Sequence, residues 1–192
     1  GPALVRSGWT VANIQKLEWK RFELLTTEFL KELGFDARMT RVGADGGVDV
    51  RLYQSGQDAP VGVAQCKAWN TFKVGIKPVR ELYGVMAAEH VEQGLFVTTS
   101  TFTEEALEFA KGKKLELVNG DTLISFIRQL PLDRKTALLD STFSGDYSTP
   151  TCPTCDIKMV SRTALKGTTP GSTFWGCPRY PRCKHTFRMR ET

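Results

Sequence analysis

The chain has 192 residues, of which 41% are apolar and 24% are charged, and its formal net charge is +5. These proportions are normal for a soluble globular protein, and no stretch approaches the roughly 18 to 20 apolar residues of a membrane helix. No segment resembles a signal peptide, so we expect a cytoplasmic protein, although Gly1-Pro2 is typical of a cleaved affinity tag and leaves an upstream targeting or membrane segment open.

The first strongly periodic segment is LEWKRFELLTTEFLKELGF at residues 17–35, which predicts an amphipathic helix that ends near Gly34. Two short β-rich segments follow, GGVDVRLY at 46–53 and VGVAQCK at 61–67. They flank the turn-like QSGQDAP at 54–60, and we therefore predict a β-hairpin.

The second half of the predicted core alternates helices and strands. We expect a helix opened by Pro78, a strand, a helix with Thr103 as N-cap, a strand and a last helix that ends before Pro131, at 78–90, 94–100, 103–113, 114–120 and 121–130.

The resulting order α-β-β-α-β-α-β-α predicts an α/β fold, a mixed sheet flanked by helices on both faces. We divide the chain into an N-terminal segment at 1–14, a main domain at 15–132, a linker at 133–150 that is rich in Ser, Thr and Gly, and a small cysteine-containing domain at 151–192.

Polar side chains gather at the open end of the predicted hairpin. If the turn centres on Gln57, paired residue numbers sum to 114, and Asp49 lies opposite Gln65. Because side chains alternate along a strand, Gln65 and Lys67 share one face while the side chain of Cys66 points to the other. Asp49, Gln65 and Lys67 are therefore expected to converge.

These residue types suit metal-assisted hydrolysis of a phosphodiester. Asp49 supplies a hard anionic oxygen for Mg²⁺ or Mn²⁺, and Gln65 and the backbone carbonyl of Cys66 supply neutral oxygens. Lys67 would orient the attacking water or offset charge on the phosphorane. Glu23 on the first helix is the best-placed second carboxylate, with a solvated surface acid as the alternative.

The segments FELLTTEFLKELGF, DGGVDV, VAQCKAW, VRELYGVM, LFVTTSTFTEEALEFA and LELVNGDTLISFI resemble, in this order, the Mrr-like branch of the PD-(D/E)XK restriction-endonuclease superfamily. The resemblance implies that Asp49 binds metal, that Gln65 and Lys67 form the QxK element, and that Glu23 is the helix-one acid. Gln65 stands where the wider superfamily has Glu, which leaves open whether one or two metals bind.

The cysteines and the charge both divide the chain near its end. Residues 1–147 hold 18 Lys or Arg and 19 Asp or Glu, a net charge of −1, whereas residues 148–192 hold 8 and 2, a net charge of +6. The latter segment contains Cys-x2-Cys, 21 residues and Cys-x5-Cys. We predict one tetrahedral Zn²⁺ site whose ligands are Cys152, Cys155, Cys177 and Cys183. A site with His185 in place of Cys183 is a less favoured alternative.

CPTCDIKMVSRTALKG with FWGCPRYPRCKHT resembles the four-cysteine zinc ribbon at the C-terminus of bacterial type I topoisomerases, which implies binding of single-stranded or distorted DNA. Basic and aromatic residues alternate in this segment, as nucleic-acid binding requires. The alternative for Phe174 and Trp175 is a place in the core of the ribbon. The predicted DNA contacts are Lys166, Trp175, Arg179, Tyr180, Arg182, Lys184 and Arg188.

Together these features predict a Mg²⁺-dependent DNA endonuclease with a DNA-binding zinc ribbon, and the resemblance implies restriction of foreign DNA such as phage DNA. Cutting both strands would call for two active sites, so we expect a homo-oligomer on DNA. Whether the DNA is single-stranded, distorted or modified stays open. Two alternatives stay open at this point: a DNA-binding module with an inactive nuclease core, and a structure-specific repair nuclease.

Overall fold

The computed structural model of the protein describes residues 8–40, 47–68, 72–166 and 170–189. Gly1-Pro2 lies outside these residues. The chain forms two compact units, residues 1–147 and residues 148–192. No helix in the described part of the chain has the length and apolar character needed to cross a bilayer.

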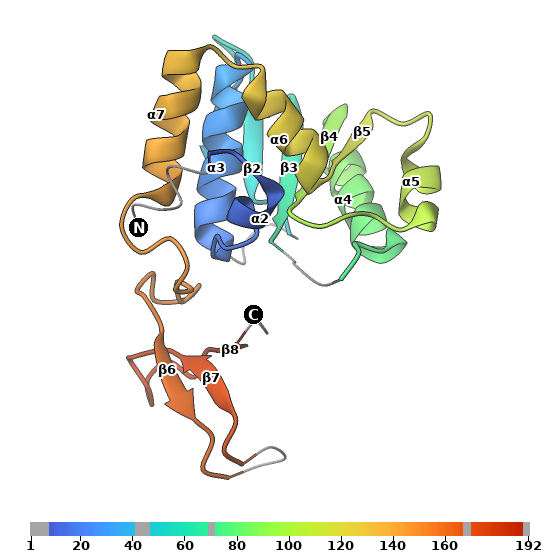
Figure 1. The fold of residues 1–192 in the computed structure, drawn as a ribbon. Helices are drawn as coiled ribbons and strands as arrows, with labels where there is room; N and C mark the ends of the chain where they lie inside the picture. The colour runs from blue at the N-terminus through green and yellow to red at the C-terminus, as the bar shows by residue number, and fades with distance from the viewer. Residues whose placement is uncertain (1–7, 41–46, 69–71, 167–169, 190–192) are drawn as a thin grey trace. The chain divides into compact units, whose positions relative to one another are not determined.

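The first unit is built on a five-stranded mixed sheet (Figure 1). Its strands lie side by side in chain order, antiparallel from β1 to β3 and parallel from β3 to β5. The strands are β1 Asp36–Met39, β2 Val50–Tyr53, β3 Gly62–Lys67, β4 Gln93–Thr98 and β5 Leu115–Val118. The predicted mixed sheet is confirmed.

Helices cover both faces of this sheet. One apolar core joins the sheet to the short α2 Val11–Ile14, α3 Trp19–Glu32, α6 Gly120–Arg128 and α7 Leu132–Phe143, and it contains Phe22, Cys66 and Ile127. A second core contains Val79 and Phe96 and joins the other face to α4 Ile76–Ala88 and α5 Glu104–Ala110. The α/β architecture is therefore as predicted.

Several element boundaries follow local chemistry. Thr103 is the N-cap of α5, as predicted, and its side chain accepts a hydrogen bond from the backbone N–H of Ala106 at 3.3 Å. Helix α4 begins at Ile76, two residues before Pro78, because proline is tolerated throughout the first helical turn. Strand β1 was not predicted, since four residues with only one buried apolar side chain give little strand signal.

The prediction of a linker over 133–150 is wrong for residues 133–143, which belong to α7. Three side chains of this helix, Leu138, Leu139 and Phe143, are buried in the core of the first unit. Residues before the predicted main domain join the same core, because Trp9 and Ile14 are also buried there. Both ends of this unit therefore contribute to its packing.

The second unit contains a three-stranded antiparallel sheet, β6 Val160–Thr163, β7 Thr173–Gly176 and β8 Thr186–Arg188. Its small core consists of Met159 and three of the cysteines, with Trp175 and Phe187 packed against them. Such a core is too small to stabilise a fold alone, so this unit needs a further source of stability.

Candidate active site and metal centre

The hairpin that carries the predicted site has the predicted register. Val50 pairs with Ala64 and Arg51 with Val63, so paired residue numbers sum to 114. Strand β2 begins at Val50, directly after Asp49. The carboxylate of Asp49 turns toward the end of β3, where it meets the backbone N–H of Cys66.

Backbone and side-chain hydrogen bonds fix Asp49. Its N–H donates to the carbonyl of Ala64 at 2.9 Å, and its own carbonyl accepts from the N–H of Thr40 at 2.9 Å. Its carboxylate Oδ2 accepts from the N–H of Cys66 at 2.6 Å. Asp49 is therefore held between β1 and β3, with one carboxylate oxygen already oriented.

Glu23 reaches the same place from α3, where it is half-buried and not a fully solvated acid. Its carboxyl forms a hydrogen bond with that of Asp49. Burial first, and then the charge of Asp49, raise the pKa of Glu23 to about 8, so the carboxyl pair retains a proton near neutral pH. Burial also raises the pKa of Asp49, against the lowering effects of the Cys66 N–H and of Lys67.

Lys67 is the last residue of β3. Its carbonyl accepts hydrogen bonds from the Thr98 hydroxyl at 2.8 Å and from the Thr99 N–H at 3.2 Å, which anchor the strand end to β4. Its positive charge lowers the pKa of both Glu23 and Asp49. The structure therefore brings two carboxyls and one ammonium together.

Gln65 is buried, with 7% of its surface exposed, and it lies beside Gly47. A Cβ at Gly47 would come within 3.0 Å of Nε2 of Gln65, and Gly47 has a φ of +93°. This glycine therefore makes room for the amide. Metal binding by Gln65 and by the carbonyl of Cys66 stays a prediction, whereas the thiol of Cys66 lies in the core that contains α3.

The paired carboxyls fit a divalent cation. Two acids that must share a proton when no cation lies between them are the hard oxygen donors that Mg²⁺ prefers. A cation would take the place of that proton. Sequence analysis missed Glu18, the N-cap of α3 and a buried acid whose charge also raises the pKa of Glu23, because only the packed structure shows that it is buried.

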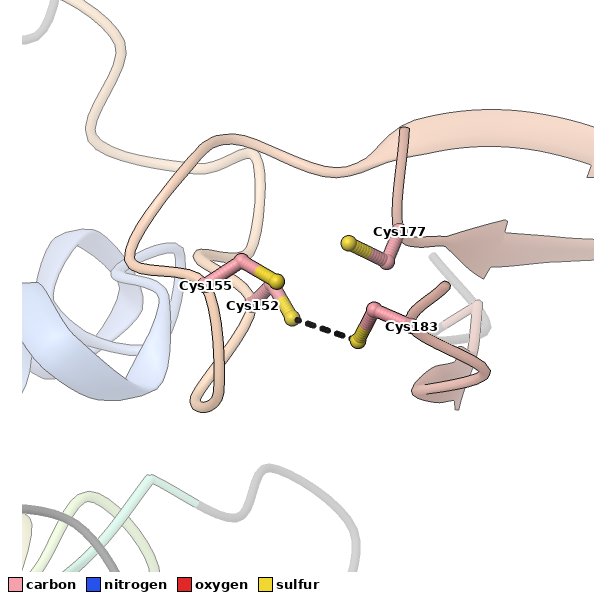
Figure 2. A group of neighbouring side chains, drawn as sticks. All are labelled: Cys152, Cys155, Cys177 and Cys183. Carbon is pink, nitrogen blue, oxygen red and sulfur yellow. Dashed lines mark hydrogen bonds between the residues drawn. The ribbon is translucent and has the colours of Figure 1, made fainter. Parts of the chain in front are cut away.

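The four cysteines of the second unit converge from two segments of the chain (Figure 2). Their sulfur atoms all lie within 4.8 Å of one another, and those of Cys152 and Cys183 are 3.7 Å apart. That separation is far above the roughly 2.05 Å of a disulfide, and it matches the edge of about 3.8 Å of a tetrahedron with Zn–S bonds of about 2.3 Å. The cluster therefore fits a zinc ion.

Backbone amides donate hydrogen bonds to two of these sulfurs, which favours the negatively charged thiolate form. The N–H of His185 donates to the sulfur of Cys183 and lowers the pKa of that thiol to about 7. The N–H of Arg179 donates to the sulfur of Cys177, although burial raises the pKa of that thiol to about 12. Among the described residues the cluster consists of cysteines alone, so the alternative ligand His185 lies outside it.

The predicted DNA contacts fall into two groups. Trp175 is half-buried and packs against the cysteine core, which is the alternative to DNA contact that the sequence left open for this residue. The other six side chains, whose DNA contacts stay a prediction, are exposed: Lys166, Arg179, Tyr180, Arg182, Lys184 and Arg188.

Comparison with known proteins places the first unit among nucleases. A restriction endonuclease family matches residues 14–127. The type IV methyl-directed restriction enzyme EcoKMrr of Escherichia coli K12 is 32% identical over 120 residues, which are 58% of this chain and 38% of that enzyme. The uncharacterized protein y4cE of Sinorhizobium fredii is 35% identical over 98 residues, 50% of this chain and 25% of that protein.

One solved structure agrees on the fold. The DNA modification-dependent restriction endonuclease AspBHI is 22% identical with a TM-score of 0.50, over 73% of this chain and 39% of that one. The MspJI restriction endonuclease in complex with a 27-mer oligonucleotide is 24% identical with a TM-score of 0.45, over 70% and 34%. The chain thus spans less than two fifths of the length of each of these four proteins.

Proposed function

The chain belongs to this restriction endonuclease family, and from that membership we propose that it is a divalent-metal-dependent DNA endonuclease. The observation that carries the proposal is the meeting of Glu23, Asp49 and Lys67 at the end of β3, where two acids share a proton beside a lysine. Anionic oxygen donors suit the metal ion of phosphodiester hydrolysis, and a nearby ammonium suits the negative charge that develops on the phosphate.

Asp49, Glu23 and Gln65, with the carbonyl of Cys66, would hold Mg²⁺ or Mn²⁺, which supplies positive charge to the scissile phosphate and to the attacking water. The chain's own groups do the rest. The Cys66 N–H holds Asp49 in one orientation, Glu23 would serve as a ligand in its deprotonated form, and the Lys67 ammonium would stabilise negative charge that develops on the phosphate.

The second unit would hold DNA while the first cuts it. With four thiols placed for Zn²⁺ and a net charge of +6, the ribbon offers the electrostatic attraction that the first unit, at −1, lacks. Cleavage of both strands would require two active sites, so we also propose that the protein acts on DNA as a homo-oligomer in the cytoplasm.

Defence against foreign DNA is the biological role that the family supports. One relative is named a methyl-directed enzyme and one structural neighbour a DNA modification-dependent endonuclease. We therefore propose that the protein recognises modified bases in its DNA substrate, and this dependence should be tested first. A structure-specific repair nuclease and an inactive DNA-binding module are the alternatives, and branched substrates and metal-dependent cleavage distinguish them.

The test is cleavage of supercoiled plasmid, unmethylated and methylated, with Mg²⁺, Mn²⁺ or neither. We expect metal-dependent nicking or linearisation that is reduced at least about 100-fold in Asp49→Ala and Lys67→Ala. The control variants Asp36→Ala and Lys114→Ala should retain full activity, because each removes one partner of an exposed ion pair, Asp36 with Arg38 and Lys114 with Glu92. If every substrate stayed uncut while DNA binding persisted, the binding module would be the better interpretation.

A further inference from the structure

The two faces of the ribbon sheet have opposite character. Strand pairing places Phe174 directly between Arg162 on β6 and Arg188 on β8. Directly paired residues project their side chains to the same side of a sheet. The three side chains therefore form one row across the sheet, which we call the Arg-Phe-Arg row.

The other face of the same sheet is closed. Trp175 pairs with Ser161 and Phe187, and both aromatic rings of this row pack against the cysteine core. Because Trp175 and Phe174 are neighbours in one strand, they point to opposite sides. Trp175 therefore packs into the cysteine core, and the Arg-Phe-Arg row lies on the side of the sheet away from the cysteines.

A second aromatic ring joins the open face. The guanidinium of Arg162 lies 5.8 Å from the ring centroid of Tyr180, which is 61% exposed. Gly176 allows this arrangement, since a Cβ there would stand 2.7 Å from Cδ of Arg162. Arg162 therefore pairs across the sheet with Phe174 and lies near the ring of Tyr180, and both Arg162 and Arg188 are exposed whereas Phe174 is half-buried.

We propose that this face binds single-stranded DNA, with unpaired bases stacked on Phe174 and Tyr180 and the adjoining phosphates neutralised by Arg162 and Arg188. The inference rests on the proposed DNA binding of the ribbon and assigns it to a surface. Only an unpaired base can offer its face to an aromatic ring, whereas a duplex presents phosphates and base edges. The net charge of +6 on residues 148–192 matches a polyanion.

The assignment differs from the one made from sequence. Trp175 was among the predicted DNA contacts. Phe174, for which the sequence left base stacking and a place in the core open, was not among them, and neither was Arg162. Arg162 and Arg188 have no ion-pair partner among the described residues, so no neighbouring acid there neutralises the charge on either side of Phe174.

The test measures binding of the full chain to a fluorescent oligo-dT and to a duplex of equal length, without added Mg²⁺ and at several salt concentrations. Phe174→Ala should weaken binding of the single strand about tenfold or more and change duplex binding less than about twofold, and Phe174→Tyr should restore it. Arg162→Ala should reduce the dependence of single-strand affinity on salt by about one phosphate contact. Leu165→Ala, at an 88% exposed position of the same unit, is the matched control.

Zinc content and circular dichroism establish that each variant keeps the ribbon folded. A full chain with both Cys155→Ser and Cys183→Ser removes the ribbon's metal site. If this chain bound DNA as tightly as the wild type, DNA binding by the ribbon would itself be wrong. Two other results would overturn only the assignment of this face to single strands. In the first, the double cysteine variant binds DNA weakly while Phe174→Ala binds it normally. In the second, Phe174→Ala loses affinity for the single strand and the duplex equally.

Discussion

At the scale of single residues, the proton shared by Glu23 and Asp49 makes the stability of the first unit depend on pH. The pKa of Glu23 is raised from 4.5 to about 8 in the fold, chiefly by burial and by Asp49. A carboxyl whose pKa rises on folding stabilises the fold fully below its unfolded pKa, and this contribution is lost as the pH rises through the folded value.

We therefore predict that, without divalent metal, the melting temperature of the first unit falls between about pH 5 and pH 9. Glu23→Gln should flatten this dependence, because an amide keeps the hydrogen bond to Asp49 without a titrating proton. Thermal melts across this range, with and without Mg²⁺, measure the effect, and added Mg²⁺ should recover stability at pH 9. The same slope in wild type and Glu23→Gln would contradict the prediction.

Cys66 lies between two residues of the candidate site, yet its thiol is buried away from solvent. Burial, with the charges of Asp49 and Glu23, raises the pKa of the thiol well above its ordinary value, so the reactive thiolate is scarce. We predict that Cys66 resists iodoacetamide in the folded protein and that Cys66→Ala cleaves DNA within a few-fold of the wild type. Mass spectrometry and the plasmid assay test both points, and loss of cleavage in a folded Cys66→Ala protein would give the thiol a role.

At the scale of elements, α7 completes the core of the first unit although its sequence suggests a linker. The ring of Phe143 lies 5.9 Å from that of Trp9 and 5.3 Å from that of Tyr147, measured between centroids. Removal of a buried aromatic side chain leaves a cavity that costs about 3 to 5 kcal/mol.

Phe143→Ala should therefore lower the free energy of unfolding of the first unit by about 3 kcal/mol. Leu132→Ala on the same helix changes a side chain that is 75% exposed and should cost less than about 0.5 kcal/mol. Urea denaturation followed by tryptophan fluorescence measures both. Equal small effects would mean that α7 is dispensable for this core.

The contrast between the hairpin and α7 explains what sequence could predict. The pairing of β2 with β3 follows from a connection centred on Gln57, so its register, and with it the nearness of Asp49 to the end of β3, was accessible. The apolar positions Leu138, Leu139 and Phe143 lie among Ser, Thr and Asp, and only the partner surface shows that they are buried. The closeness of Glu23 to Asp49 likewise depends on packing between distant segments.

The ribbon shows the same limit for binding residues. Four cysteines at this spacing predict a metal centre, because tetrahedral geometry requires few other contacts. Which of Phe174 and Trp175 packs against the cysteines depends on the side of β7 that meets them. Alternation along the strand makes the two residues opposite, but it does not choose between them.

At the scale of the whole molecule, we propose that the first unit cuts DNA and the second binds it, and the two units differ in charge. The first unit carries a net charge of −1 and the second +6. Affinity for DNA arises largely from phosphates neutralised by Lys and Arg, so it should depend mainly on the second unit.

We predict that deletion of residues 148–192 weakens DNA binding at least about tenfold and makes the remaining affinity less dependent on salt, because fewer phosphates are neutralised. The candidate active site should survive, since Glu23, Asp49, Lys67 and α7 all lie in residues 1–147. Fluorescence anisotropy at matched salt measures the affinity, and the rise in melting temperature with Mn²⁺ measures metal binding in both chains. Equal DNA affinity with and without the tail would show that the first unit holds DNA despite its charge, whereas loss of the Mn²⁺ effect would mean that the two units depend on each other.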